Sequence, residues 1–178
     1  MNNIWHDISP QRISPKDFIC VIEIPKGSKK KYELDKETGC LILDRILYTS
    51  THYPANYGFI PRTLSDDGDP LDVLVLCSEP VFNTCLVRCR PIGVIIMEDN
   101  GQQDEKIIAL PFGDPTYARY NSIEELPSHI LDEMVHFFTV YKQLEGVDTF
   151  VYKHENREAA ERIIKENIEA YKNKYGND

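Results

Sequence analysis

The sequence contains no apolar run long enough to cross a membrane, and its first ten residues lack the basic region and apolar stretch of a secretory signal. Its five cysteines never form a Cys-x-x-Cys pair, and most lie inside apolar stretches such as "VLVLC" (73–77) and "CLVRC" (85–89). This pattern is typical of buried, reduced thiols rather than of disulfides. We therefore expect a cytoplasmic protein with no membrane partner.

Basic residues are also scarce. The chain has 20 Lys and Arg against 29 Asp and Glu, which gives a formal net charge of -9 at pH 7. A nucleic-acid partner usually needs a basic face, so the composition argues against one. The same charge repels an anionic substrate, unless bound cations reverse the sign of the potential at the site.

No internal repeat, low-complexity tract or linker divides the sequence, so we expect one domain over residues 1–178. Alternating or continuous apolar patterns predict strands at residues 18–24, 30–34, 40–47, 72–77, 85–97 and 105–110. The segment 98–104 joins the last two strands, and its Asn100-Gly101 pair is a strong hairpin signal.

Helical periodicity is found only towards the end of the chain. Residues 127–145 carry apolar side chains at helical spacing, and residues 156–174 form a second periodic segment that opens with Asn156 as its expected N-cap. Strands followed by two helices predict an α+β domain, mainly β, built on a small barrel with the helices packed outside.

The stretch "DDGDPLD" (66–72) places four carboxylates in seven positions, and Gly68 and Pro70 keep it out of a helix. Neighbouring carboxylates repel one another by roughly 1 kcal/mol in water and by more where water is excluded. A solvated turn avoids this cost by pointing its acids outward, and a metal site avoids it with cations. For any single acid the solvated turn is a sufficient explanation.

The predicted 98–104 hairpin supplies further acids beside its turn, Asp99 and Asp104. Convergence of two acidic loops would suit a hard cation such as Mg²⁺, which prefers oxygen ligands. The sequence does not match other known metal-binding or phosphate-binding motifs. Gly68 is misplaced for an EF-hand loop, the five histidines show no zinc spacing, and the Walker, H-E-x-x-H and G-x-S-x-G patterns are absent.

Basic and phenolic side chains could form a second wall that binds phosphate oxygens. Lys31 and Arg45 lie on facing arms of a predicted hairpin, and Lys106 follows Asp104 by two residues. Three more candidates are Tyr57, just before the acidic bend, and Tyr141 and Lys142, near the end of the first helix.

At this point the sequence resembles a known family, the soluble family I inorganic pyrophosphatases of the bacterial type. The similarity covers roughly residues 15 to 170 and rests on blocks that occur in the family's order: "KYE" (31–33), "LDR" (43–45), "YPANYGFIP" (53–61), "DGDPLDV" (67–73), "VRCRPIGVI" (87–95) and "HFFTVYK" (136–142). The resemblance implies hydrolysis of pyrophosphate to two phosphates, several Mg²⁺ ions per site, a five-stranded OB-like barrel, and a homohexamer built as two trimers.

The resemblance also implies a role for each site residue. Asp69 is expected to accept the proton of the attacking water, with Asp67 beside it in the catalytic centre. The expected metal ligands are Asp67, Asp72, Asp99, Asp104, Glu33 and Glu23. The expected substrate-binding residues are Lys31, Arg45, Tyr57, Lys106, Tyr141 and Lys142.

Two other functions remain open from the sequence. A metal-dependent phosphatase acting on organic phosphates would use a similar set of acids and bases. An OB-like nucleic-acid binding module would need a basic groove with stacking aromatic residues, which the acidic composition disfavours.

Overall fold

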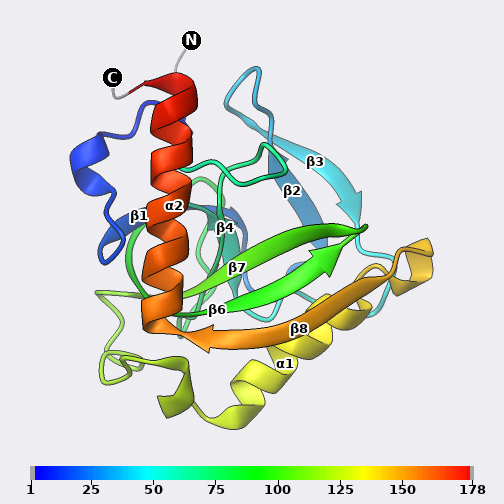
Figure 1. Cartoon of the computed structure of the whole chain (residues 1–178). Coiled ribbons are helices and arrows are strands. Elements are labelled where there is room, and N and C mark those ends of the chain that lie inside the picture. The colour runs from blue at the N-terminus through cyan, green and yellow to red at the C-terminus, as the bar shows by residue number, and fades with distance from the viewer. Residues whose placement is uncertain (1–2, 177–178) are drawn as a thin grey trace.

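The computed structural model describes residues 3–176, and its strands form a closed ring of five. Figure 1 shows the ring with a separate hairpin beside it. Pairing runs around the ring in the order β1 (Phe18–Ile24), β4 (Asn56–Phe59), β5 (Asp72–Val75), β7 (Gln102–Pro111) and β6 (Leu86–Asp99). β6 also pairs with β1, which closes the ring.

Two elements extend this ring. β8 (Thr149–Asn156) pairs with β6 as a sixth strand. The hairpin of β2 (Lys30–Leu34) and β3 (Leu41–Ile46) forms its own two-stranded sheet. Because this hairpin shares no strand pairing with the ring, its position depends on side-chain contacts and on the chain segments at its ends.

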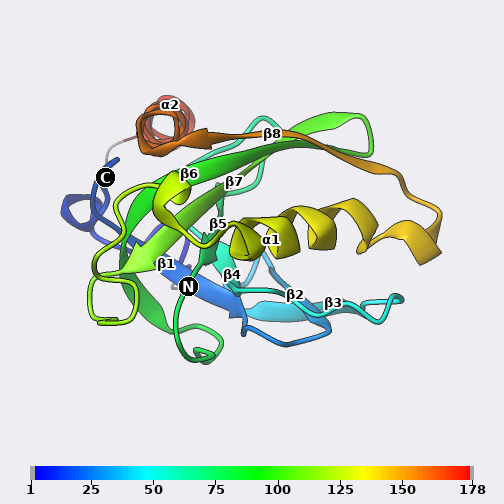
Figure 2. The same ribbon diagram turned by 90° about the horizontal axis from the view of Figure 1, so that it is seen from below.

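The two helices pack on different faces of the sheet, as Figure 2 shows. The core beside α1 (Ser128–Val140) contains Leu74 and Ile108, whereas the core beside α2 (Arg157–Tyr175) contains Val73 and Ile107. Successive residues of a strand point to opposite faces, so β5 and β7 serve both cores, and their paired segments 73–75 and 107–109 are continuously apolar. Short 3-10 helices complete the described chain at Pro10–Arg12, Ile123–Glu125 and Gln143–Glu145, and the last of these is called η3 here.

The β6–β7 hairpin is longer than the sequence predicted. Asn100 and Gly101 have φ values of 51° and 79°, as a two-residue type I′ turn requires, and the strands run up to this turn on both sides. The predicted connecting segment 98–104 is therefore wrong in its extent. Asp99 and Asp104 lie within strands, at positions held by strand pairing rather than in a loose loop.

The predicted fold class is confirmed: the chain is mainly β with two helices outside. Asn156 caps α2, because its Oδ1 accepts the Ala159 N–H at 3.1 Å. Two strands escaped prediction. β4 has only four residues. β8 lies between the two helices in the sequence, and most of its side chains are exposed, including Phe150 and Tyr152. No helix within residues 3–176 is both long and apolar enough to span a membrane.

Gly58 permits the close approach of β4 to β1. A Cβ atom at this position would lie 1.9 Å from the carbonyl oxygen of Val21 and 2.8 Å from its carbonyl carbon. Both atoms belong to the backbone of the neighbouring strand, so they cannot move aside without breaking the β1–β4 ladder. The adjacent residue, Tyr57, is a site candidate, so this contact also sets part of the site.

Replacing Gly58 with alanine is expected to destabilise the protein by about 3 kcal/mol or more, because the new methyl group would clash with the backbone of β1. Urea unfolding of Gly58→Ala checks this. Gly113→Ala is the matched control, since a Cβ there meets no atom within 4 Å. A Gly58→Ala protein as stable as Gly113→Ala would contradict the assignment.

Candidate active site

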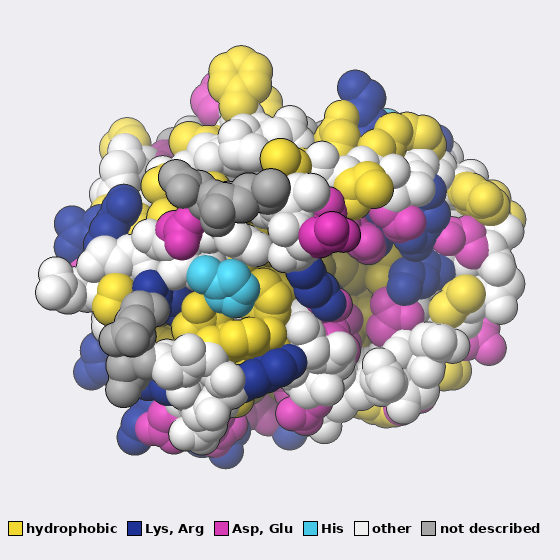
Figure 3. Space-filling view, turned by 90° about the horizontal axis from the view of Figure 1, so that it is seen from above, with side chains coloured by type: hydrophobic (Ala, Val, Ile, Leu, Met, Phe, Trp, Pro, Cys, Tyr) yellow, Lys and Arg dark blue, Asp and Glu magenta, His cyan; other side chains and the backbone are white. Residues whose placement is uncertain are grey.

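A cavity of about 310 Å³ opens between the β2–β3 hairpin, the acidic bend, the ring and the end of α1. Figure 3 shows acidic and basic side chains close together around a hollow on the right of this face. The charged and phenolic residues that line the cavity are Glu23, Lys31, Tyr32, Glu33, Lys36, Tyr57, Asp67, Asp69, Asp72, Asp99, Lys106, Tyr141 and Lys142.

This single cavity collects almost the whole predicted site. Among the predicted residues, only Arg45 and Asp104 are absent from its lining. Asp104 lies directly behind it, with Oδ2 2.7 Å from the Nζ of Lys106. Arg45 is held to one side by Asp44, a residue that also pairs with Lys31 at 3.4 Å. The structure therefore brings together residues from positions 23 to 142.

The acidic bend is built by its own hydrogen bonds. The Asp69 N–H donates to Oδ1 of Asp67 at 2.9 Å, and the Ser65 N–H donates to the carbonyl oxygen of Asp69 at 2.8 Å. Gly68 sits between them with φ of 88°, a conformation that side chains of L-residues disfavour. The bend holds Asp67 and Asp69 at the cavity, and β5 begins directly afterwards at Asp72.

Lys106 is the buried cation of the site. Parallel pairing of β5 and β7 sets it opposite Asp72, and its Nζ lies 2.5 Å from Asp72 Oδ2 as well as beside Asp104. The ammonium group is also 5.7 Å from the ring centre of Tyr57. Burial lowers the pKa of Lys106, but the attraction of Asp72, Tyr57 and Asp104 outweighs burial and leaves the pKa well above its ordinary value.

Several carboxyl groups at the cavity have raised pKa values, and burial is the largest cause for each of them. Burial, with a further contribution from Asp72, raises the pKa of Glu23 to about 8. Burial also raises the pKa of Asp104 to about 6, against the opposing effect of Lys106. The pKa of Asp67 is raised, again mainly by burial. Ionising these acids together is therefore costly, and a bound cation would reduce that cost.

Lysines stand between most of the acids. Besides the pairs of Lys106, Lys31 pairs with Glu33, Lys36 pairs with Asp69, and Lys142 pairs with Asp99. Within residues 3–176, accordingly, no three His, Cys, Asp or Glu residues converge as a ready-made metal cage. A divalent cation would have to compete with these ammonium groups for the carboxylate oxygens.

The donor set nevertheless fits Mg²⁺. Carboxylate oxygens are the ligands that this ion prefers. Burial raises the pKa values of Glu23, Asp67 and Asp104, and the negative charge of Asp72 raises each of them further. Oδ1 of Asp99 is in addition buried with no hydrogen-bond partner among the described residues. Such an oxygen is unfavourable unless a ligand satisfies it.

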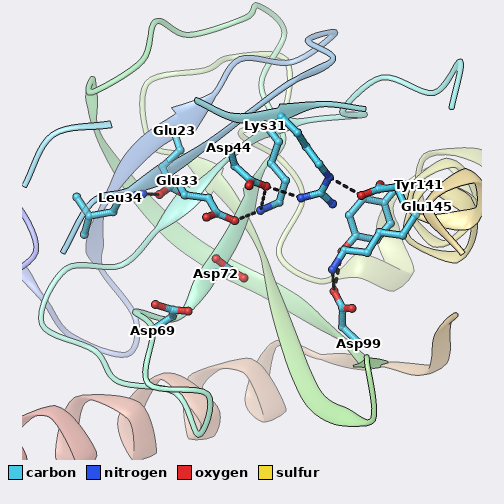
Figure 4. A network of polar contacts seen from close by, with 12 residues as sticks. Glu23, Lys31, Glu33, Leu34, Asp44, Asp69, Asp72, Asp99, Tyr141 and Glu145 are labelled. Atoms are coloured by element: carbon cyan, nitrogen blue, oxygen red, sulfur yellow. Dashed lines mark hydrogen bonds and ion pairs between the residues drawn. The ribbon is translucent and has the colours of Figure 1, made fainter. Parts of the chain in front are cut away.

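The end of α1 forms the opposite wall, shown in Figure 4. The hydroxyl of Tyr141 donates to Asp99 Oδ2 at 2.8 Å, and Lys142 Nζ lies 2.6 Å from the same oxygen. Burial raises the pKa of Asp99, but these hydrogen bonds outweigh burial and lower the pKa overall. A phosphate group bound here would therefore accept hydrogen bonds from Tyr141 and Lys142, the donors that Asp99 uses.

The sequence reasoning missed three residues of this region. Lys36 lines the cavity from the turn after β2, where it resembled an ordinary surface charge. Asp44 and Glu145 hold Arg45 from two sides. Asp44 is the neighbour of Arg45 in "LDR", and that adjacency was the only available signal.

Comparison with known proteins identifies the family of the chain. The sequence profile of the inorganic pyrophosphatase family matches residues 20–172. The chain belongs to the inorganic pyrophosphatase family. It is 49% identical to the inorganic pyrophosphatase of Halalkalibacterium halodurans over 160 residues, which are 90% of this chain and 98% of that protein.

Other members of the family give the same result. Soluble inorganic pyrophosphatase 2 of Chlamydomonas reinhardtii is 48% identical over 171 residues, 96% of this chain and 89% of that protein. The structure of the inorganic pyrophosphatase from Helicobacter pylori superposes with a TM-score of 0.86 at 46% identity, covering 89% of this chain and 95% of that one.

Magnesium is expected to stabilise the folded protein more at pH 8 than at pH 5.5. The folded-state pKa values of Glu23 and Asp104, about 8 and about 6, lie above the ordinary 4.5 and 3.8, so without cations these two groups lower stability as the pH rises through that range. Protons and cations compete for the same oxygens.

Thermal unfolding with and without Mg²⁺ measures this effect. At pH 8 and a hundredfold excess over Kd, we expect Tm to rise by about 5–10 °C, and at pH 5.5 by clearly less. KCl at matched ionic strength controls for screening, and EDTA should reverse the shift. Equal shifts at both pH values would show that these acids do not bind the cation.

Proposed function

We propose that this chain hydrolyses inorganic pyrophosphate to two phosphate ions, with Mg²⁺ as its cofactor. The observation that carries the proposal is the single cavity in which crowded carboxylates face lysine and tyrosine donors. Its relatives, such as those of Halalkalibacterium halodurans and Helicobacter pylori, are named as inorganic pyrophosphatases. Carboxylates suit the cations that accompany pyrophosphate, and the donors suit its oxygens.

In the proposed reaction a water oxygen attacks one phosphorus atom, and the bond from that phosphorus to the bridging oxygen breaks. Asp69 accepts the proton lost by the water, and the second phosphate leaves with the bridging oxygen. Bound Mg²⁺ would supply charge neutralisation and would lower the pKa of water. Asp69 suits the role of base because it projects from the bend into the cavity and is half exposed, while Asp67 fixes its backbone.

The remaining residues divide by chemistry. We assign Mg²⁺ to the carboxylates Asp67, Asp72, Asp104, Asp99, Glu33 and Glu23. Of these, Glu23 also holds the backbone of β2, since its Oε1 accepts the Leu34 N–H at 2.8 Å. We assign phosphate oxygens to Lys31, Arg45, Tyr57, Lys106, Tyr141 and Lys142, of which all but Arg45 line the cavity. Lys106 could do so only while it also balances Asp72 and Asp104.

Phosphate release is the direct test of the proposed function. The purified chain with Mg²⁺ should release phosphate from pyrophosphate and should be inactive in EDTA. A sugar phosphate at the same concentration should release far less. Faster release from the organic monoester would instead identify a metal-dependent phosphatase, the alternative that the sequence left open.

The role of Asp69 generates a sharper prediction. Asp69→Asn keeps the shape of the side chain and removes its basicity, so kcat at saturating Mg²⁺ should fall by roughly 10²–10⁴-fold. Its Mg²⁺ affinity should change little. Asp72→Asn is the contrasting variant, because it removes an assigned ligand and should weaken Mg²⁺ binding in calorimetry.

Recovery of Asp69→Asn by excess Mg²⁺ would show that Asp69 acts as a ligand and not as the base. Near-normal turnover of the variant would reject the assignment altogether. Either result would mean that a group other than Asp69 accepts the proton, and the overall reaction would stay the same.

We also propose a homohexamer of two trimers that uses the outward face of α1. His129 and His136 are exposed on this helix, and Val140 is partly exposed, whereas Met134 and Phe137 are buried in the core. Light scattering should report a mass several times the 20.6 kDa of one chain. A monomer at neutral pH and micromolar concentration would contradict this proposal.

A cytoplasmic location is part of the same proposal. All five cysteines are free, as a reducing compartment would keep them, and the net charge of -9 gives no support for a nucleic-acid partner. Cell fractionation that recovers the protein in an oxidising compartment would argue against this location.

A further inference from the structure

The width of the cavity depends on two elements that do not share a sheet. One is the β2–β3 hairpin, which carries Lys31, Glu33 and Arg45 and has no strand pairing with the ring. The other is the end of α1, which carries Tyr141 and Lys142. Something must set the distance between them if both are to bind one small anion.

One ion pair joins the two elements. Arg45 Nε lies 2.6 Å from Glu145 Oε1, and Glu145 belongs to η3, which begins directly after Lys142. Figure 4 shows this pair reaching from the hairpin to the corner where Tyr141 stands. Among residues 3–176, no other ion pair or side-chain hydrogen bond connects the hairpin to this corner.

The guanidinium group of Arg45 is oriented from two sides. Glu145 forms an ion pair at Nε that lacks hydrogen-bond geometry, and Asp44 accepts a hydrogen bond from Nη1. Nη2 makes no hydrogen bond to another residue within the described chain. Since a guanidinium has donors along three edges, Nη2 remains available for an anion, although Arg45 stands beside the cavity and is not among its lining residues. Lys31, which lines the cavity, is the strand-pairing partner of Arg45.

Glu145 is poorly satisfied for a residue with a purely structural role. Its side chain is only 14% exposed, and its second oxygen, Oε2, is buried without a hydrogen-bond partner in the described residues. Leaving one oxygen of a buried carboxylate unsatisfied costs stability. Gly146, with φ of 72°, ends η3 immediately afterwards and fixes the backbone that presents this carboxylate.

We propose that Glu145 is a positioning residue for substrate binding: it holds the guanidinium group of Arg45 so that Nη2 faces the anion, and it links the hairpin wall to the Tyr141–Lys142 wall. The inference rests on the proposed function, because the anion is taken to be pyrophosphate. Glu145 itself does not touch the substrate. Its effect should therefore appear in binding and should require Arg45.

The test compares Glu145→Gln with the wild-type chain. Glutamine keeps the size and an acceptor oxygen but removes the charge that holds Arg45. KM for magnesium pyrophosphate should rise roughly 3–10-fold while kcat stays within about twofold, as expected for loss of one charge-assisted contact that acts on binding. The Kd of imidodiphosphate, a pyrophosphate analogue with a P–N–P bridge, should rise by the same factor in calorimetry with Mg²⁺.

A double-mutant cycle separates positioning from a general structural role. In the Arg45→Gln background, adding Glu145→Gln should change KM and Kd by less than about twofold, because the group it positions is gone. Glu169→Gln, on the exposed side of α2, is the matched control and should behave as wild type. Equal effects of Glu145→Gln with and without Arg45 would overturn the proposal, as would an unchanged KM and Kd in the single variant.

The two measurements also distinguish this proposal from the proposed function. If the wild-type chain binds imidodiphosphate but does not hydrolyse pyrophosphate, the proposed function fails, and the Kd of the variants still decides the role of Glu145. If the wild-type chain binds neither compound, both proposals are rejected.

Discussion

The crowding of buried carboxylates around one ammonium group is the constraint on which the rest of the site depends. Lys106 lies between Asp72 and Asp104 in a place that water hardly reaches. Burial raises the pKa values of Asp104 and Glu23, and the negative charge of Asp72 raises both further. A divalent cation bound to these carboxylate oxygens would lower the free-energy cost of ionising them.

The closed ring is what produces this crowding. Parallel pairing of β5 with β7 places Asp72 beside Lys106, and the tight Asn100-Gly101 turn keeps Asp99 and Asp104 in ordered strands. Close contact at Gly58 draws β4 against β1. Asp72, Asp99 and Asp104 are thus held by strand pairing, so movements of loops cannot relieve the repulsion among them.

Much of this could be predicted from local sequence, because local patterns encode local structure. The Asn100-Gly101 turn, the Asn156 cap and the "DDGDPLD" bend each depend on residues a few positions apart. β8 was missed because its apolar residues form one short group, Phe150, Val151 and Tyr152, that is followed by the polar stretch "KHEN", and β4 was missed because it is short. The resemblance supplied the individual roles, and these remain proposals for the present chain.

The contacts of the site were less predictable, since they join residues far apart in sequence. Nothing near Glu145 indicates that it pairs with a residue of β3, one hundred positions earlier along the chain. Nothing in the turn around Lys36 indicates its contact with Asp69. Such pairs arise only when the hairpin, the bend and the end of α1 are brought together by the fold.

The claim that this cavity is a divalent-cation site is tested most directly by anomalous diffraction from crystals grown with Mn²⁺, an ion that also prefers oxygen ligands. The account predicts anomalous peaks within the cavity, bordered by carboxylate oxygens of Asp67, Asp72 and Asp104. Manganese found only on surface acids at saturating concentration, with Lys106 still between Asp72 and Asp104, would contradict it.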